Sequence, residues 1–421
     1  MSPCESSADV FEAILTLRTR LSRVTGQAVA AHPARVLRAF SALAALWERR
    51  LNAGWTPPAG SSFPWAQVRL SLVALLPGFA EARAWLGKAT SPLPPGPGRG
   101  IALVLAGNTP LLAWAPLAAA LLAGHAVFVK QSRDETLWTR LFVESLAEGD
   151  AELAALIHLD LWPGDDPRTI ALVQSADAVI AYGGDTAIAA LRSAVPETVP
   201  FFGFGHALSI GLLFDGDTGH EQAGQGFAAD VLMYGQGGCL SPHVIFTGGG
   251  RPSLARGRFG NEYLPESLAA ACRLLDVTPV RDPAVATAVR QARDLAAFDG
   301  YRLEGDPDLR WTVACTGTPR ILPPPIGHGF VFVIPIPERS WDPERITDRF
   351  GAARGRISSV GIAGESTREL RAALQADGVS RVCKPGEMQT PPLDWPNGNI
   401  DLLTELLKIG PPPHGEPLGS G

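Results

Sequence analysis

The sequence predicts an α/β protein, with a parallel sheet covered by helices on both faces. Three observations support this prediction. Between residues 100 and 194, short apolar runs alternate with helix-like segments, as expected for parallel strands joined by crossover helices. A succession of strands and helices restarts at Gly235. The chain has 421 residues, 46% hydrophobic and 19% charged. This composition fits a globular protein of about two to three domains.

The first half of the chain is predicted to form helices, followed by a regular alternation of strands and helices. Residues 8–95 have apolar spacings of three and four, which predict two or three amphipathic helices, and residues 93–98 (Leu-Pro-Pro-Gly-Pro-Gly) predict a break. Strands are predicted at 100–106, 126–130, 156–161 and 178–182. Helices are predicted at 110–123, 134–148 and 168–174, and from the cap at 183–185 to 194.

Fewer elements are predicted in the second half of the chain. The predicted elements together divide the chain into four segments. Strands are predicted at 243–246 and 330–334. Helices are predicted at 265–275, 284–297 and 365–376, and an apolar helix within 391–407, followed by a disordered tail from 411. The predicted segments are a helical segment (1–97), a sheet domain (98–234), a second α/β domain (235–385) and a C-terminal segment (386–421).

Charge and cysteine content narrow the class of protein. The net charge of −6 and pI of about 5.8 argue against nucleic-acid binding. The most apolar stretch, 111–123, is too short to span a bilayer, and no secretory signal is present, so a cytoplasmic setting is expected. The five cysteines include no CxxC pair, so neither a disulfide framework nor a metal site is predicted. Four of them are expected to be structural or incidental, namely Cys4, Cys272, Cys315 and Cys383.

The fifth cysteine, Cys239, has an unusual setting. It lies in Tyr-Gly-Gln-Gly-Gly-Cys-Leu-Ser-Pro-His (234–243), between a helix-like and a strand-like stretch. Small neighbours let a carbonyl approach the sulfur, and a flexible backbone can direct N–H groups towards it. These features favour a nucleophile that forms thioester or thiohemiacetal intermediates. The alternative is a buried cysteine that packs as a small hydrophobe.

Ligands of parallel sheets bind outside the carboxyl ends of the strands. The candidate loops there are 107–109, 130–133 and 183–186. Their order along the chain, together with Phe-Gly-His-Ala-Leu-Ser (204–209) and the Cys239 segment, resembles the aldehyde dehydrogenase superfamily. Within it, the chain is most similar to the acyl-CoA reductase family of bacterial bioluminescence, and the ending at 378–398 is similar as well. The resemblance covers residues 98–408. It implies an aldehyde-dehydrogenase-like fold with a parallel-sheet dinucleotide-binding domain (98–234) and a second α/β catalytic domain that carries the cysteine (235–385).

The resemblance also implies catalytic roles. The Cys239 thiolate attacks an acyl carbonyl, and the Asn108 side-chain amide and the Cys239 backbone N–H stabilise the resulting oxyanion. Asn108 has an alternative role as a turn residue, because Asn-Thr-Pro favours turns.

The cofactor positions follow in the same way. Lys130 matches the superfamily lysine that reaches the adenosine ribose. Arg133 stands where a glutamate commonly binds both ribose hydroxyls, and a guanidinium pairs with a 2′-phosphate that a carboxylate repels, so NADPH is expected. Gly183 and Gly184 allow close approach of a cofactor to a helix N-terminus. The alternative interpretation of Arg133 is an ordinary solvated charge, and that of Gly183 and Gly184 is a tight turn. Ser132 and Thr186 lie in the same loops and are further cofactor-binding candidates.

One departure from the superfamily bears on the reaction. The general-base glutamate of hydrolytic aldehyde dehydrogenases aligns with Gly203, and no acid lies between Val199 and Phe214. Without that base an acyl-Cys239 survives for reduction. The sequence therefore predicts NADPH-dependent reduction of an acyl-CoA, with coenzyme A as part of the substrate, to the aldehyde.

Rival hypotheses remain open at this point. One is a hydrolytic NAD(P)-dependent aldehyde dehydrogenase, and another is a non-catalytic dinucleotide-binding subunit. In a third, the acyl group arrives on a carrier or an acyl-transferring partner protein. A homo-oligomer is expected, whereas no motif reports the acyl chain length.

Overall fold

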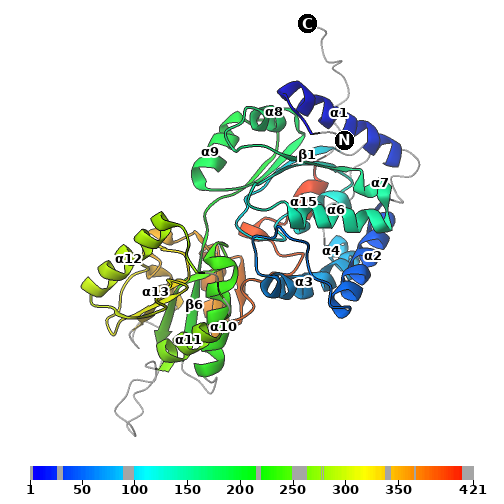
Figure 1. Ribbon diagram of the computed structural model, residues 1–421. Helices are drawn as coiled ribbons and strands as arrows, with labels where there is room; N and C mark the ends of the chain where they lie inside the picture. The colour runs from blue at the N-terminus through cyan, green and yellow to red at the C-terminus, as the bar shows by residue number, and fades with distance from the viewer. Residues whose placement is uncertain are drawn as a thin grey trace. The chain divides into compact units, whose positions relative to one another are not determined.

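A computed structural model describes residues 3–25, 32–88, 99–214, 220–248, 263–275, 277, 279–336, 343–364 and 367–409 (Figure 1). The predicted break at 93–98 and the tail from 411 lie outside these residues. The chain forms two compact units. Unit 1 comprises Met1–His206, Pro392–Pro396 and Ile400–Gly421, and unit 2 comprises Ala207–Pro391 and Asn397–Asn399. Each unit contains a sheet of mainly parallel strands with helices on both faces, so the predicted α/β fold is confirmed.

Unit 1 contains a five-stranded parallel sheet in the order β3-β2-β1-β4-β5. Its strands are β1 (Gly100–Val104), β2 (Ala126–Gln131), β3 (Ile157–Leu161), β4 (Ala178–Tyr182) and β5 (Phe201–Phe204). The first four were predicted. Strands β1 and β2 are buried along their whole length, which explains their continuous apolar runs.

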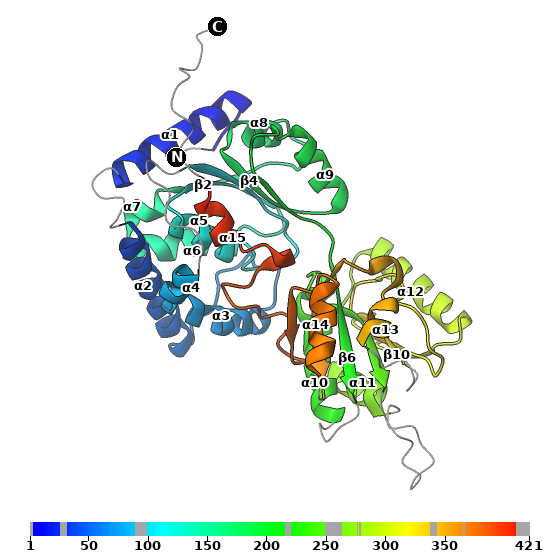
Figure 2. The same cartoon turned by 180° about the vertical axis from the view of Figure 1, so that it is seen from behind.

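The connecting helices of unit 1 divide between the two faces of this sheet. They are α5 (Trp114–Leu122), α6 (Leu137–Gly149), α7 (Ala151–Ala154), α8 (Arg168–Ser175) and α9 (Asp185–Ala194). Figures 1 and 2 show α8 and α9 on one face and α5 and α6 on the other, where α15 (Leu402–Leu407) also lies. The chain winds in both directions from β1. The strand order therefore reverses between β1 and β4, and such a reversal is where doubly wound sheets bind ligands.

The N-terminal helices belong to unit 1. They are α1 (Ser7–Thr25), α2 (His32–Asn52), α3 (Trp65–Ala80) and α4 (Ala82–Lys88), where two or three were predicted. An ion pair of Arg18 with Asp177 (3.0 Å) joins α1 to the segment before β4. Helix α2 packs through an aromatic cluster in which the ring centroids of Trp47 and Trp114 lie 5.8 Å apart.

Unit 2 contains a seven-stranded sheet in the order β12-β11-β6-β7-β10-β9-β8. Its strands are β6 (Leu208–Phe214), β7 (Pro242–Gly248), β8 (Arg302–Gly305), β9 (Thr312–Cys315), β10 (Phe330–Pro335), β11 (Ile357–Ala363) and β12 (Arg381–Cys383). All neighbours are parallel except the β8–β9 pair at one edge. Strands β7 and β10 were predicted and the other five were not.

Two apolar cores lie on opposite faces of this second sheet. On one face, β-strand side chains such as Ile210 and Phe246 pack against α12 (Pro283–Phe298), α13 (Pro343–Asp348) and α14 (Arg368–Ala376). On the other face, Ile245 and its neighbours pack against α10 (His220–Leu232) and α11 (Tyr263–Leu274). The described residues also include three short 3-10 turns, η2 (Met233–Gln236), η5 (Gly351–Ala353) and η6 (Asn397–Asn399).

The compact units divide the chain at 206/207, whereas the sequence placed a boundary at 234/235. The difference has a simple physical origin. Strand β6 pairs with both β7 and β11, and α10 covers the same sheet, so residues 208–232 belong with the second unit. Among the described residues, no helix combines the length and hydrophobicity needed to cross a bilayer.

Candidate active site

The loop after β1 carries Asn108 and approaches the loop after β2 closely. Asn108 is exposed, and Gly107 precedes it. A Cβ atom on Gly107 would lie 2.5 Å from Ser132 Oγ and 2.7 Å from Asp134 Cβ. Only glycine therefore permits this contact between the two loops. Because β1 and β2 are parallel neighbours, both loops leave the carboxyl edge of the sheet side by side.

Two cations lie near each other at the end of β2. Lys130 is the fifth residue of this strand and is 6% exposed, whereas Arg133 is exposed in the following loop. Burial lowers the pKa of the Lys130 ammonium, the Arg133 guanidinium lowers it further, and Asp166 opposes them. An anion bound beside Lys130 and Arg133 would relieve both the desolvation and the repulsion. This pair of charges is suited to a phosphate.

The loop after β4 begins α9. Gly184 is the residue before the helix, and no side chain caps it. The Asp185 carboxylate accepts a hydrogen bond from the His206 backbone N–H (2.7 Å). A Cβ atom on Gly184 would come within 3.2 Å of the His206 ring, while Gly183 and exposed Thr186 flank this point. Strand β4 is the neighbour of β1 across the reversal in strand order, so this loop lies next to the Asn108 loop.

The structure therefore brings together the predicted cofactor-binding residues of unit 1 at one edge of its sheet. The ends of the three adjacent strands β2, β1 and β4 carry them. These residues are Lys130, Ser132, Arg133, Gly183, Gly184 and Thr186, with Asn108 between them.

Cys239 belongs to unit 2, in the turn between η2 and β7. Its side chain is half-buried, and its carbonyl oxygen accepts a hydrogen bond from Ser209 Oγ (2.7 Å) of β6. Burial raises the pKa of the Cys239 thiol, and a hydrogen bond from its own backbone N–H opposes the rise. Cys239 therefore lies at the amino ends of β6 and β7, where burial disfavours its thiolate form.

The turn before Cys239 has an uncommon backbone. Tyr234, Gly235 and Gln236 have φ angles of 55°, 62° and 61°, all in the left-handed region. Two of them are not glycine, so the turn is strained and needs support. The Gln236 side-chain amide supplies it by donating to the carbonyl oxygens of Pro242 (3.0 Å) and Phe330 (3.1 Å).

A second set of side chains, missed by the sequence analysis, supports the same loop from behind. The Gln389 amide donates to Ser241 Oγ (2.6 Å) and to the Asp230 carbonyl oxygen (3.0 Å). The Asp230 carboxylate accepts the backbone N–H groups of Gly386 (2.6 Å) and Met388 (3.0 Å). One signal in the sequence pointed to this network. Asp230 interrupts the apolar run of α10, and an acid in such a run is buried and partnered.

Gly203, which the sequence analysis aligned with the general-base glutamate, is surrounded by apolar atoms. Gly203 lies in β5, and a Cβ atom there would be 2.6 Å from the Phe201 ring and 2.8 Å from Ile188 Cγ2. No glutamate fits at this position without displacement of both side chains.

The fold defines the class of protein first. The chain is similar in structure to a glyceraldehyde-3-phosphate dehydrogenase of Methanocaldococcus jannaschii solved with NADP, with a TM-score of 0.68, 13% identity, and 91% of this chain and 87% of that chain covered. It is also similar to a NAD-dependent benzaldehyde dehydrogenase of Corynebacterium glutamicum, with a TM-score of 0.66, 14% identity, and 96% and 90% covered. The protein thus has the aldehyde dehydrogenase fold, as expected.

Sequence comparison then gives the family. Residues 95–408 match the family described as acyl-CoA reductase (LuxC), and the chain belongs to this family of acyl thioester reductases. It is 28% identical over 147 residues to a long-chain acyl-protein thioester reductase of Aliivibrio fischeri. That alignment covers 34% of this chain and 30% of the relative, so it spans about a third of the relative's length. The predicted resemblance is confirmed.

Proposed function

We propose that this protein reduces an acyl thioester to an aldehyde, with NADPH as the reductant and Cys239 as the nucleophile. The observation that carries the proposal is Cys239 itself, held in a supported turn within a chain of this family. The proposed substrate is a free acyl-CoA. The name of the Aliivibrio fischeri relative supports an acyl group carried on a protein as the alternative donor.

The proposed reaction assigns a step to each group. The Cys239 thiol loses its proton and attacks the acyl carbonyl, so that a new carbon–sulfur bond forms and the thiol of coenzyme A leaves with a proton. The Asn108 amide and the Cys239 backbone N–H stabilise the oxyanion. When bound, the cofactor supplies the hydride that reduces the Cys239 thioester. The resulting thiohemiacetal then collapses to aldehyde and regenerates the Cys239 thiol.

The charges of unit 1 support NADPH as the cofactor. Lys130 and Arg133 lie at the end of β2 and interact electrostatically. A 2′-phosphate would neutralise them, whereas an unmodified ribose would leave them unpaired. Gly183, Gly184 and Thr186 at the N-terminus of α9, together with Ser132, complete the proposed cofactor-binding set. One structurally similar dehydrogenase was solved with NADP and another is named NAD-dependent, so both cofactors occur on this fold.

The filled space at Gly203 favours reduction over hydrolysis. A hydrolytic enzyme needs a base to activate water. The Phe201 and Ile188 side chains occupy the space into which a side chain at position 203 would extend. The acyl-enzyme therefore lasts until it is reduced. We also propose a homo-oligomer in a reducing cytoplasmic setting, which keeps Cys239 as a thiol.

The test is single-turnover mass spectrometry of the intact protein with a panel of acyl-CoA chain lengths and no reductant. We expect a gain of one acyl group on Cys239, discharged as aldehyde when NADPH is added. Cys239→Ala should form no adduct, and Cys272→Ala, which removes a buried thiol elsewhere in unit 2, should react normally. An acyl-CoA reductase activity that survives in Cys239→Ala would refute the mechanism. If acyl-CoA forms no adduct and an acylated protein does, the donor is a protein.

A further inference from the structure

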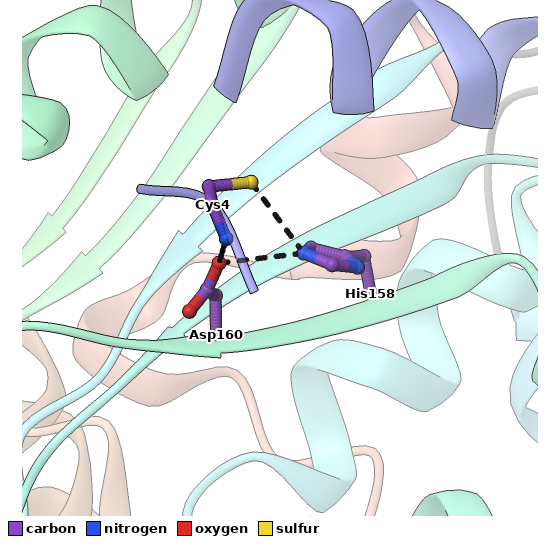
Figure 3. Close-up of side chains that lie close together, drawn as sticks. All are labelled: Cys4, His158 and Asp160. Atoms are coloured by element: carbon purple, nitrogen blue, oxygen red, sulfur yellow. Dashed lines mark hydrogen bonds and ion pairs between the residues drawn. The ribbon is translucent and has the colours of Figure 1, made fainter. Parts of the chain in front are cut away.

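A cysteine, a histidine and a carboxylate meet in unit 1 at β3. His158 and Asp160 are alternate residues of this strand, so both side chains point to the same face of the sheet. Cys4 comes from the segment that precedes α1 and reaches this face (Figure 3). The three residues are 4%, 4% and 6% exposed, so the cluster is closed off from solvent. The sulfur, imidazole nitrogen and carboxylate oxygen lie within 4.8 Å of one another.

The side-chain contacts of His158 within the cluster are long: the one to Asp160 exceeds a normal nitrogen–oxygen hydrogen bond, and the one to Cys4 is a long hydrogen bond to sulfur. His158 Nε2 lies 3.6 Å from Asp160 Oδ2 and 3.9 Å from Cys4 Sγ. Hydrogen bonds between nitrogen and oxygen normally measure about 2.7–3.2 Å. Ligands held at roughly 2.0–2.3 Å from a common tetrahedral cation are instead about 3.4–3.6 Å apart. One imidazole nitrogen faces both other groups, and this spacing is compatible with three ligands around a shared ion.

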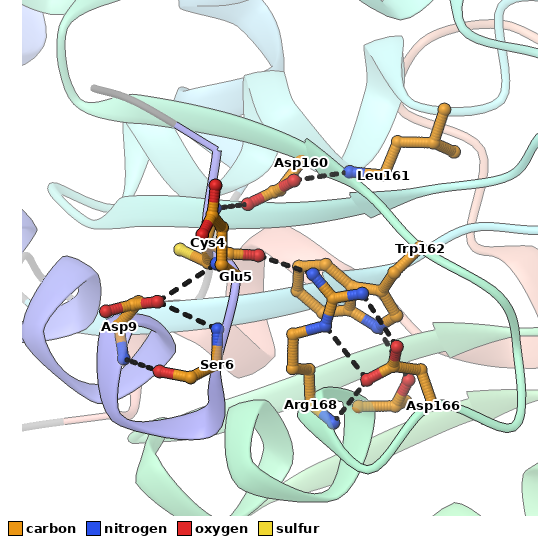
Figure 4. Close-up of polar contacts among 10 residues, drawn as sticks. Cys4, Glu5, Ser6, Asp9, Asp160, Leu161, Trp162, Asp166 and Arg168 are labelled. Carbon is orange, nitrogen blue, oxygen red and sulfur yellow. Dashed lines mark hydrogen bonds and ion pairs between the residues drawn. The ribbon is translucent and has the colours of Figure 1, made fainter.

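The chemistry of the three groups also matches a cation. A thiolate and a carboxylate carry two negative charges, which a divalent ion would neutralise in this buried place. Arg168, a cation beside the cluster, is already engaged, because its guanidinium pairs with Asp166 (2.7 Å) and donates to the Cys4 carbonyl oxygen (Figure 4).

The surroundings are ordered around the His158 ring. Its centroid lies 4.5 Å from that of Phe128, the residue paired with His158 on β2. The Asp160 carboxylate accepts the backbone N–H groups of Cys4 (2.6 Å) and Leu161 (2.7 Å), which fix its orientation. Such outer contacts orient ligands in metal sites.

We propose that Cys4, His158 and Asp160 bind one borderline divalent cation, with Zn²⁺ as the preferred ion and a water in the fourth position. Thiolate, imidazole and carboxylate are the ligands that zinc takes in proteins. The ion would tie the segment before α1 to β3, about 154 residues away along the chain. The sequence predicted no metal site, and this proposal does not depend on the proposed reductase activity.

The experiment uses Co²⁺ as a spectroscopic probe in the full-length Cys239→Ala protein, which removes the proposed nucleophile as a competing thiol. We expect about one retained Co²⁺ per chain and a thiolate-to-cobalt absorption band in the near ultraviolet. Adding Cys4→Ala should abolish the band, and Asp160→Asn should weaken binding by about 10- to 100-fold. Adding Cys272→Ala is the matched control and should leave both readouts unchanged.

A second measurement does not depend on the folding of a variant. In the chain with intact Cys4, Zn²⁺ should slow alkylation of Cys4, as located by peptide mass spectrometry, while alkylation of Cys272 stays the same. A chelator should reverse the protection. The proposal is overturned if no Co²⁺ is retained, if the band survives Cys4→Ala, or if Zn²⁺ leaves the Cys4 rate unchanged.

Discussion

At the scale of single residues, the state of the Cys239 thiol is set by its burial. The raised pKa means that the thiolate is scarce at neutral pH. We expect slow alkylation of Cys239 by iodoacetamide near pH 7 and a steady rise in rate with pH, because the thiolate is the reactive species. Peptide mass spectrometry reports the rate at Cys239 alone. Equal rates at about pH 6 and about pH 9 would contradict a protonated thiol.

A second prediction at this scale concerns Arg133. Replacing Arg133 with Glu should lower kcat/KM for NADPH relative to NADH by about 10- to 100-fold, the value of one to two charge-assisted hydrogen bonds. The matched control is Arg140→Glu, which reverses an exposed charge on α6, and it should leave the ratio unchanged. Steady-state kinetics with both cofactors gives the answer. An unchanged preference in Arg133→Glu would mean that this arginine is an ordinary solvated charge.

Asp230 gives a prediction about pH. Burial raises the pKa of this carboxyl from 3.8 to about 7. The folded protein therefore holds a proton that the unfolded chain has released, so this contribution to stability is full below about pH 4 and is lost as pH rises towards 7. The free energy of unfolding should fall between about pH 4 and about pH 7 more steeply in the natural protein than in Asp230→Asn. Urea denaturation at several pH values compares them, and parallel curves would contradict the raised pKa.

At the scale of elements, the contact between the loops after β1 and β2 depends on Gly107. Gly107→Ala places a methyl group against Ser132 and Asp134 and should destabilise unit 1 by about 1–3 kcal/mol. It should also weaken NADPH binding, because the displaced loop carries Ser132 and Arg133. Gly164→Ala is the control, since nothing lies within 4 Å of its Cβ position. Denaturation midpoints and cofactor titration measure both effects. Equal behaviour of the two variants would show that the loops are not constrained.

Several of the predicted strands have a continuous apolar signal. Strands β1, β2 and β4 have buried runs, and the turns after them contain Gly107 and Gly183. Local hydrogen bonds place some helix ends away from their predicted positions. Helix α6 begins at Leu137 rather than at residue 134, because Ser132 and Glu135 form a bridge and the Glu135 carboxylate accepts the Trp138 N–H (2.6 Å).

Two of the missed strands, β11 and β8, lack that signal for physical reasons. Strand β11 is buried throughout but contains Ser358, Ser359 and Gly361. Gly361 is needed because Met388 Sδ lies 2.6 Å from where its Cβ would be. Edge strand β8 carries Arg302 and Glu304, which resemble a surface loop in sequence. The supporting contacts of Gln236 and Gln389 join residues far apart along the chain, and a single sequence does not report such pairs.

At the scale of the whole molecule, the two compact units should respond differently to ligand. The aromatic cluster around Trp47, Trp114 and Trp138 lies in unit 1. Among the residues that the structure describes, unit 2 has a single tryptophan, Trp311. Tryptophan fluorescence therefore reports mainly on unit 1. NADPH should raise the fluorescence-detected melting midpoint in proportion to the logarithm of its concentration, since it binds the folded unit. A midpoint that does not move at saturating NADPH would place the cofactor elsewhere.

The two edges of the unit 2 sheet have a consequence for how molecules of this protein meet. Both edge strands are short, with β12 spanning Arg381–Cys383 and β8 spanning Arg302–Gly305. An incoming strand from another chain would find few free backbone partners and would face the charges of Arg302 and Glu304 at β8. Natural sheets use short and charged edges to block strand addition and fibrous aggregation. The homo-oligomer that we propose should therefore assemble through other surfaces than these edges.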